Sequence, residues 1–278
     1  MATRISIVST KGGVGKTTLT ANLGAILADL GKRVLLVDAD IQPTLSSYYP
    51  LADQAPHGLV DVIEAGDLTD STSVTTVGCD IILSNDPAGK LPDWILHTPD
   101  GRFRLKRLLK RLEAYDFVLI DTQGAAGPLQ DMAVLAADLL ISPIPPELLS
   151  AREFARGTIG MIERLSRMED LGFPLGNLYG LIYRMDRTAD ARATAEALRA
   201  MCYGPSRGRI MILDTVIPAT VVYREAASAQ QPVHRFEPTR QGPTPGGLES
   251  MLNLIRELPS GLEEAVLSPG DVPRSAKP

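Results

Sequence analysis

The segment that most restricts the fold of this chain is Thr10–Thr18, with the sequence TKGGVGKTT. It follows a short apolar run, RISIVS, and precedes a stretch with the hydrophobic period of a helix, residues 16–30. A glycine-rich turn between a strand and a helix lets backbone N–H groups and the helix N-terminus surround an anion. We therefore expect a phosphate-binding loop whose backbone is supplied by Gly12, Gly13, Val14 and Gly15.

Three side chains of the same segment have the chemistry that a nucleoside triphosphate and its magnesium ion require. Lys16 is placed to reach the β- and γ-phosphates, and Thr17 to give its hydroxyl to Mg²⁺. Thr18 is expected to bond a further phosphate oxygen. The segment therefore predicts a Mg-dependent ATPase with ATP and Mg²⁺ as cofactors.

The remaining chain alternates short apolar runs with segments of helical period. The runs FVLID and LLISPI lack polar alternation, as strands buried on both faces do. The pattern predicts an α/β fold, a doubly wound and mostly parallel sheet with helices on both faces. We expect one domain over residues 1–258 and a flexible tail over 259–278. Residues 41–79 are interpreted as loops with short helices, because prolines interrupt them. Longer helices are expected over residues 16–30, 102–115, 149–168, 188–201 and 247–258.

Aspartates end two of the predicted strands. Asp38 and Asp40 end RVLLVDAD, and Asp121 ends FVLID. Open α/β sheets bind ligands at the carboxyl ends of their strands, so these carboxylates are expected to face the phosphate loop. A strand that ends in aspartate is also the pattern of a carboxylate that holds Mg²⁺ directly or through water. The alternative for Asp38 and Asp40 is that they only form a turn.

Composition restricts the partners. A net charge of −5 argues against a protein that coats nucleic acid through overall charge, so a basic surface would have to be local. Cys79 and Cys202 form no CxxC motif, which predicts neither a disulfide framework nor a metal site built on cysteine. No apolar run approaches the roughly 20 residues that span a bilayer, and the first residues do not form a signal peptide. We expect a cytoplasmic protein without a membrane partner.

The glycine loop departs from the usual GxxxxGK[ST] pattern, because Thr10 stands at the first glycine and Lys11 follows it. KGGVGKTT resembles the deviant Walker A loop of the ParA/MinD family of ATPases. The resemblance implies that Lys11 reaches across a dimer interface to the partner's nucleotide. A cation supplied only by a second copy couples association to ATP, because both copies then share the γ-phosphate charge. An ATP-dependent homodimer is therefore expected, and a solvated loop lysine is the alternative.

Two further segments resemble the switches of the same family. VDADIQP resembles switch I, which implies that Asp38 lies near Mg²⁺ and that Asp40 orients the attacking water. DTQGAAG resembles switch II and follows Asp121. Ile41 and Gln123 stand where the family usually has proline. The implied catalytic residues are Lys11, Lys16 and Asp40, and the implied metal ligands are Thr17, Asp38 and Asp121.

The match to ParA proteins extends over roughly residues 3–258. GLIYRMDRTADAR resembles the strand and loop that end near the adenine, which implies that Arg184, Met185 and Asp186 lie by the base. TVIPATVVYREAASAQQPVHRFEPTRQG resembles a second ParA segment, which implies that Ile217 and Pro218 border the same base.

Residues 184–240 contain nine arginines and six acidic residues, a local charge of +3. ParA proteins of the short type bind double-stranded DNA non-specifically as ATP dimers, and a ParB-like centromere-binding protein stimulates hydrolysis. The resemblance implies the same here, with salt-dependent phosphate contacts and nucleoid association in the ATP-bound state. A solvated charged face is the alternative, and Ala219 stands where the family often has arginine. The candidate DNA contacts are Arg192, Arg207, Arg209 and Arg224.

A second basic segment, RFRLKRLLKRLEAY, precedes the strand FVLID. Its leucines fall on one helical face and its cations surround the other. We interpret it as a structural helix with a charged outer face, in preference to a DNA or membrane helix.

The function that the resemblance implies is segregation or maintenance of a plasmid, chromosome or integrated element, and three other functions of related ATPases are alternatives. A ParA-like ATPase that positions a protein cargo is not separated from it by the sequence. A MinD- or FlhG-like membrane-associated regulator needs a basic amphipathic C-terminal helix, which EEAVLSPGDVPRSAKP does not supply. A reductase like the nitrogenase iron protein needs cysteines that bridge subunits, and none stands near switch II.

Overall fold

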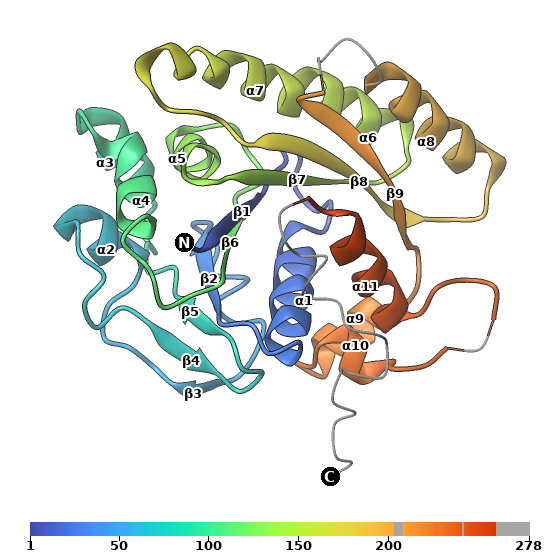
Figure 1. Cartoon of the computed structure of the whole chain (residues 1–278), viewed down its shortest axis with the longest axis horizontal. Coiled ribbons are helices and arrows are strands. Elements are labelled where there is room, and N and C mark those ends of the chain that lie inside the picture. Colours follow the sequence, from blue (N-terminus) through green and yellow to red (C-terminus); the bar gives the residue numbers. More distant parts are fainter. Residues whose placement is uncertain (203–207, 241, 260–278) are drawn as a thin grey trace.

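The computed structural model describes residues 1–202, 208–240 and 242–259 (Figure 1). In this part of the chain, one nine-stranded sheet has the order β3-β4-β5-β2-β6-β1-β7-β8-β9. The pairs from β5 to β9 are parallel, whereas β3–β4 and β4–β5 are antiparallel. The predicted doubly wound, mostly parallel sheet is confirmed. Arg207 and most of the predicted tail, residues 260–278, lie outside the described residues.

The strands are β1 (Thr3–Ile7), β2 (Val34–Ala39), β3 (Leu51–Asp53), β4 (Ser73–Thr75), β5 (Asp80–Ile82), β6 (Phe117–Thr122), β7 (Leu139–Ile144), β8 (Asn177–Met185) and β9 (Ile210–Pro218). The helices are α1 (Lys16–Asp29), α2 (Leu59–Ala65), α3 (Leu91–His97), α4 (Gly101–Leu109), α5 (Pro128–Ala136), α6 (Leu148–Glu153), α7 (Ile159–Ser166), α8 (Ala189–Cys202), α9 (Val222–Ser228), α10 (Val233–Phe236) and α11 (Gly247–Glu257). A π-helical turn, Phe154–Thr158, joins α6 to α7, and a 3₁₀ turn, Glu169–Leu171, follows α7.

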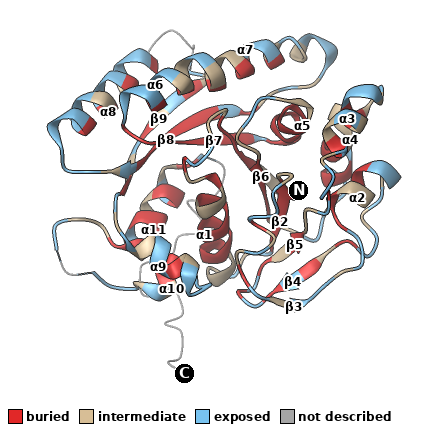
Figure 2. Ribbon diagram, turned by 180° about the vertical axis from the view of Figure 1, so that it is seen from behind, coloured by how far each residue is buried: buried red, intermediate tan, exposed pale blue. Residues whose placement is uncertain are grey.

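Helices cover both faces of the sheet, which explains why its central strands are apolar throughout. Every residue of β2, β6 and β7 is buried. One core contains the buried sides of α1, α9, α10 and α11. On the other face, α2–α5 and α6–α8 pack over two further cores. Figure 2 shows the buried residues on the sides of these helices that face the sheet.

The segment 41–79 corrects the sequence interpretation. Besides α2 it contains β3 and β4, two strands of three residues that extend the sheet in antiparallel fashion beyond β5. Strands this short do not show an alternating pattern in the sequence, and their pairing depends on β5. The predicted helix 149–168 is present, but the π-helical turn divides it.

The first part of the basic segment before β6 forms α4, which packs on the sheet as expected but ends at Leu109, whereas the sequence predicted a helix over 102–115. Leu105, Leu108 and Leu109 are buried in the core. Arg104 lies over the ring of Trp94 and donates hydrogen bonds to carbonyls of α2. Lys106 donates a hydrogen bond to the carbonyl of Pro174, and Arg107 forms an ion pair with Asp100, which supports a structural helix. In the described ranges, no helix is long and apolar enough to cross a membrane.

Candidate functional site

The parallel strands bring three separate segments together at one edge of the sheet. β6 pairs with both β1 and β2, and in the β2–β6 ladder Asp38 stands opposite Asp121. The glycine loop follows β1, and α1 begins at its last lysine, Lys16. The carboxyl ends of β1, β2 and β6 therefore meet where an open α/β sheet binds its ligand.

The glycine loop has a conformation that its sequence makes possible. Gly13 and Gly15 have φ values of 72° and 105°, a region that glycine occupies without steric cost. A Cβ atom on Gly15 would lie 2.3 Å from the ring of Tyr183, a residue of β8. Tyr183 therefore packs directly beneath the start of α1, a contact that no pattern in the sequence indicates.

The segment after β6 lies against this loop. A Cβ atom on Gly124 would be 2.6 Å from the Cα of Gly12. Gln123, which stands in place of a proline, donates a hydrogen bond of 3.5 Å to the carbonyl of Ala125 in its own loop. The backbones of the two segments are therefore in close contact at Gly12 and Gly124.

Two buried carboxylates lie on neighbouring strands, Asp38 on β2 and Asp121 on β6, and Asp121 contacts the first turn of α1. The hydroxyl of Thr17 donates a hydrogen bond of 2.6 Å to Asp121. Asp38 accepts hydrogen bonds of 2.7 Å from both the backbone N–H and the hydroxyl of Ser46. Both aspartates have no exposed surface. Ser46 is a partner of Asp38 that is not predicted from the sequence.

Burial changes the proton affinity of these groups. It raises the pKa of Asp121 to about 7, although the hydrogen bond from Thr17 opposes this. It raises the pKa of Asp38 to about 6, against the hydrogen bonds from Ser46. Burial also lowers the pKa of Lys16, while the charges of Asp121 and Asp40 oppose that shift. Two desolvated carboxylates with a single ammonium group form a site that favours an added cation.

The donor set fits magnesium. Among the described residues, no group of three or more His, Cys, Asp or Glu side chains is placed to hold a metal ion. Mg²⁺ is commonly bound by one or two carboxylates together with phosphates and water. Thr17, Asp38 and Asp121 offer such oxygen donors beside the phosphate loop.

The helix that contains the π-helical turn holds the beginning of the loop. Lys11 Nζ donates a hydrogen bond of 2.8 Å to the hydroxyl of Ser150 on α6. The hydroxyl of Thr10 donates one of 2.8 Å to Glu153, and its N–H donates one of 3.3 Å to the hydroxyl of Thr158. Turns of π-helix occur frequently at functional sites. No pattern in the sequence indicates these three partners, because they lie about 140 residues beyond the loop.

A cavity of about 490 Å³ adjoins Thr18 in the first turn of α1. Arg184, Ile217 and Pro218, three of the five residues predicted to lie by the base, line this cavity. Met185 lies outside it and packs on the core beneath α7 and α8. Asp186 also lies outside it and accepts hydrogen bonds from the N–H and hydroxyl of Thr188, just before α8. The structure therefore brings three of these five residues to the cavity.

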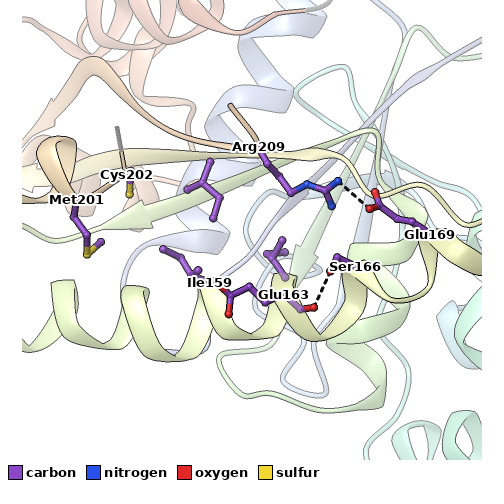
Figure 3. A pocket seen from close by; sticks show the side chains of 9 residues that line it. Ile159, Glu163, Ser166, Glu169, Met201, Cys202 and Arg209 are labelled. Carbon is purple, nitrogen blue, oxygen red and sulfur yellow. Dashed lines mark hydrogen bonds and ion pairs between the residues drawn. The ribbon is translucent and has the colours of Figure 1, made fainter. Parts of the chain in front are cut away.

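The candidate DNA contacts do not share one face. Arg192 is exposed in the first turn of α8, and Arg224 is exposed on α9. Arg209 precedes β9 and therefore lies at the amino end of that strand, whereas Arg224 follows its carboxyl end. It forms an ion pair of 2.8 Å with Glu169 and lines a separate cavity of about 300 Å³ beside α7 (Figure 3).

A glycine loop between β1 and α1, with carboxylates at the ends of neighbouring strands, is the architecture of P-loop nucleotide-binding proteins. Residues 2–169 match a family described as "AAA domain". The chromosome-partitioning ATPase Soj of Thermus thermophilus is 32% identical over 251 residues, which is 86% of this chain and 90% of that protein. The chain therefore belongs to the ParA/Soj-type ATPases of the ParA/MinD family.

Solved structures show the same fold. An ATP complex of McdA from Cyanothece has the same fold, with a TM-score of 0.75 over 95% of this chain and 96% of that one, at 22% identity. The cobyrinic acid a,c-diamide synthase of Mycobacterium smegmatis, solved with an ATP analog and magnesium, is 28% identical. Its TM-score is 0.68, over 88% of this chain and 99% of that one.

Proposed function

We propose that this protein is a Mg-dependent ATPase of partition type. ATP makes it dimerise, the dimer binds double-stranded DNA without sequence preference, and a ParB-like partner stimulates hydrolysis and release. The process segregates or maintains a plasmid, chromosome or integrated element. The main support is the separation of two lysines in one loop: Lys16 is buried beside the carboxylates, whereas the ammonium of Lys11 donates a hydrogen bond to Ser150 on α6.

Each site residue has a role in hydrolysis that its position supports. The loop backbone and Lys16 would hold the phosphates, with Thr17, Asp38 and Asp121 around Mg²⁺. Bound magnesium would neutralise charge on the phosphates. Asp40 is half-buried at the end of β2, close enough to Lys16 to affect the pKa of that amine. From there, its carboxylate would orient the attacking water.

The dimer would be completed through Lys11. In a single subunit this ammonium has a neutral partner, Ser150, so no ion pair must break when it moves to a phosphate. Leu148 and Leu149, next to Ser150, are 57% and 70% exposed. An exposed apolar pair beside the lysine suits an interface with a second copy.

DNA binding would use arginines with free guanidinium groups. Arg192 is exposed and has no hydrogen-bond or ion-pair partner for its side chain in the described part of the chain. Arg209 is less suited, because Glu169 neutralises it. We infer a cytoplasmic protein that associates with the nucleoid when ATP is bound. The same cycle of ATP binding and hydrolysis would also serve to position a protein cargo. Retention of plasmid DNA distinguishes the two functions.

Gel filtration and retention of plasmid DNA, each with Mg-ATP or Mg-ADP, test this function together. We expect a dimer that retains DNA only with ATP. A dimer that retains no DNA at low salt would favour a protein cargo. A single subunit at saturating Mg-ATP, with hydrolysis blocked, would contradict the proposed function.

A further inference from the structure

The cavity beside Thr18 has an apolar floor. Tyr183 and Ile217 are buried, and the rings of Tyr183 and Tyr223 lie 6.2 Å apart in an edge-to-face arrangement. Pro218 completes this surface. At about 490 Å³, the cavity has the size of small-molecule sites, and its floor suits a flat aromatic group.

Two arginines from different elements stand at the rim of this cavity. Arg184 comes from the end of β8 and Arg224 from α9. Both are exposed, and neither forms an ion pair with an acidic residue of the described ranges. An aromatic floor with uncompensated positive charge above it suits a ligand that is both aromatic and anionic, as a nucleotide is.

The two guanidinium groups stand at different distances from the glycine loop. Arg184 donates a hydrogen bond of 3.0 Å to the carbonyl of Gly13, so its side chain reaches the phosphate loop. Its φ of 61° is rare for a residue with a side chain, and strained backbone of this kind is common at ligand sites. Arg224 follows the β9 end of the cavity, beyond Pro218, and also borders a shallow groove with Phe236.

The geometry points to Arg224 as a contact for the nucleotide base, in contrast to the DNA contact that its charge suggested, and to Arg184 as its counterpart at the phosphates. This inference rests on the proposed function, because only phosphates in the glycine loop would place a base in the cavity. A planar, weakly hydrated guanidinium stacks well on an aromatic ring. Arg224 would thus cover the face of the base that the apolar floor leaves open.

Competition against a fluorescent ATP analog, without DNA, tests the division of roles. Two competitors are compared, ATP and inorganic tripolyphosphate, which has the phosphates but no base. Arg224→Ala should weaken ATP by about two- to fivefold, the range for a cation over an exposed ring, and leave tripolyphosphate unchanged. Arg184→Asn should weaken both, since asparagine tolerates the positive φ of this position.

Arg111→Ala is the matched control, because Arg111 is an exposed arginine just beyond α4 and does not line the cavity. It should change neither affinity, and thermal unfolding of all variants confirms that they are folded. Equal weakening of ATP and tripolyphosphate by Arg224→Ala would overturn the base contact. An unchanged ATP affinity of Arg224→Ala would also overturn it. If that variant then lost DNA retention at saturating ATP, Arg224 would be a DNA contact instead. Failure of the unmodified protein to bind ATP would instead refute the proposed function itself.

Discussion

Thr17 and Asp121 are 104 residues apart in the sequence, yet the hydroxyl of one donates a hydrogen bond of 2.6 Å to the carboxylate of the other. Thr17 is in the first turn of α1, and Asp121 is near the end of β6. Their contact joins the phosphate loop to the strand that precedes switch II. Both oxygen atoms therefore lie at one place, which is where the proposed magnesium ion would bind.

Asp121→Asn should abolish ATP turnover while stabilising the nucleotide-free protein. Burial raises the pKa of Asp121 to about 7, above its ordinary value of 3.8. The folded state therefore holds a proton that the unfolded chain has lost, and the free energy of unfolding falls as pH rises from about 4 to about 7. In the unmodified protein, the free energy of unfolding should fall by about 1 kcal/mol or more over this range. The neutral amide of Asn does not titrate, so the variant should lack this contribution. Thermal or urea unfolding without magnesium at pH 5 and pH 8 measures it. A fall of the same size in the variant would contradict the prediction.

Lys11→Ala should bind ATP with nearly the affinity of the unmodified protein but remain a single subunit. Its ammonium lies on Ser150, outside the group of Lys16 and the buried aspartates. Nucleotide titration followed by gel filtration with Mg-ATP checks both parts. Lys16→Ala is the contrasting variant and should lose nucleotide binding. An ATP-dependent dimer of Lys11→Ala would remove its role across the interface.

Asp40→Ala should bind ATP and accumulate as a dimer, because the water would no longer be oriented. Loss of such a group commonly slows a reaction by about 10²- to 10⁴-fold. Phosphate release and gel filtration are the measurements. Turnover equal to that of the unmodified protein would show that Asp40 only shapes the turn, where it accepts a hydrogen bond from the N–H of Gln42.

Arg192→Ala should weaken DNA retention without changing the affinity for ATP. Each phosphate contact that is lost reduces the magnitude of the slope of log affinity against log salt by about one. A dimer has two copies of Arg192, so the magnitude of its slope should fall by about two. The slope is measured from binding at several salt concentrations. Arg111→Ala again supplies a control for the loss of one exposed positive charge, and an unchanged slope for Arg192→Ala would exclude Arg192 from the DNA surface.

The sequence by itself determined the parts of this protein that depend on local backbone chemistry. Gly13 and Gly15 predict a loop with positive φ, and the apolar runs of β6 and β7 predict strands that are buried on both faces. Parallel pairing then requires the residues that follow β1, β2 and β6 to meet at one edge. For this reason the sequence alone predicts that Lys16, Thr17, Asp38 and Asp121 lie close together, and the structure has them at one end of the sheet.

Only the tertiary structure decided which distant side chains complete the site. Ser150 holds Lys11, Glu153 holds Thr10, and Tyr183 packs against Gly15, all across more than 100 residues of chain. Such contacts leave no periodic signal, because they arise when helices and strands pack. The same holds for Arg209 and Arg224, which carry equal charges. Arg209 forms an ion pair, whereas Arg224 lies at the rim of a cavity, because packing sets the neighbours of each guanidinium group.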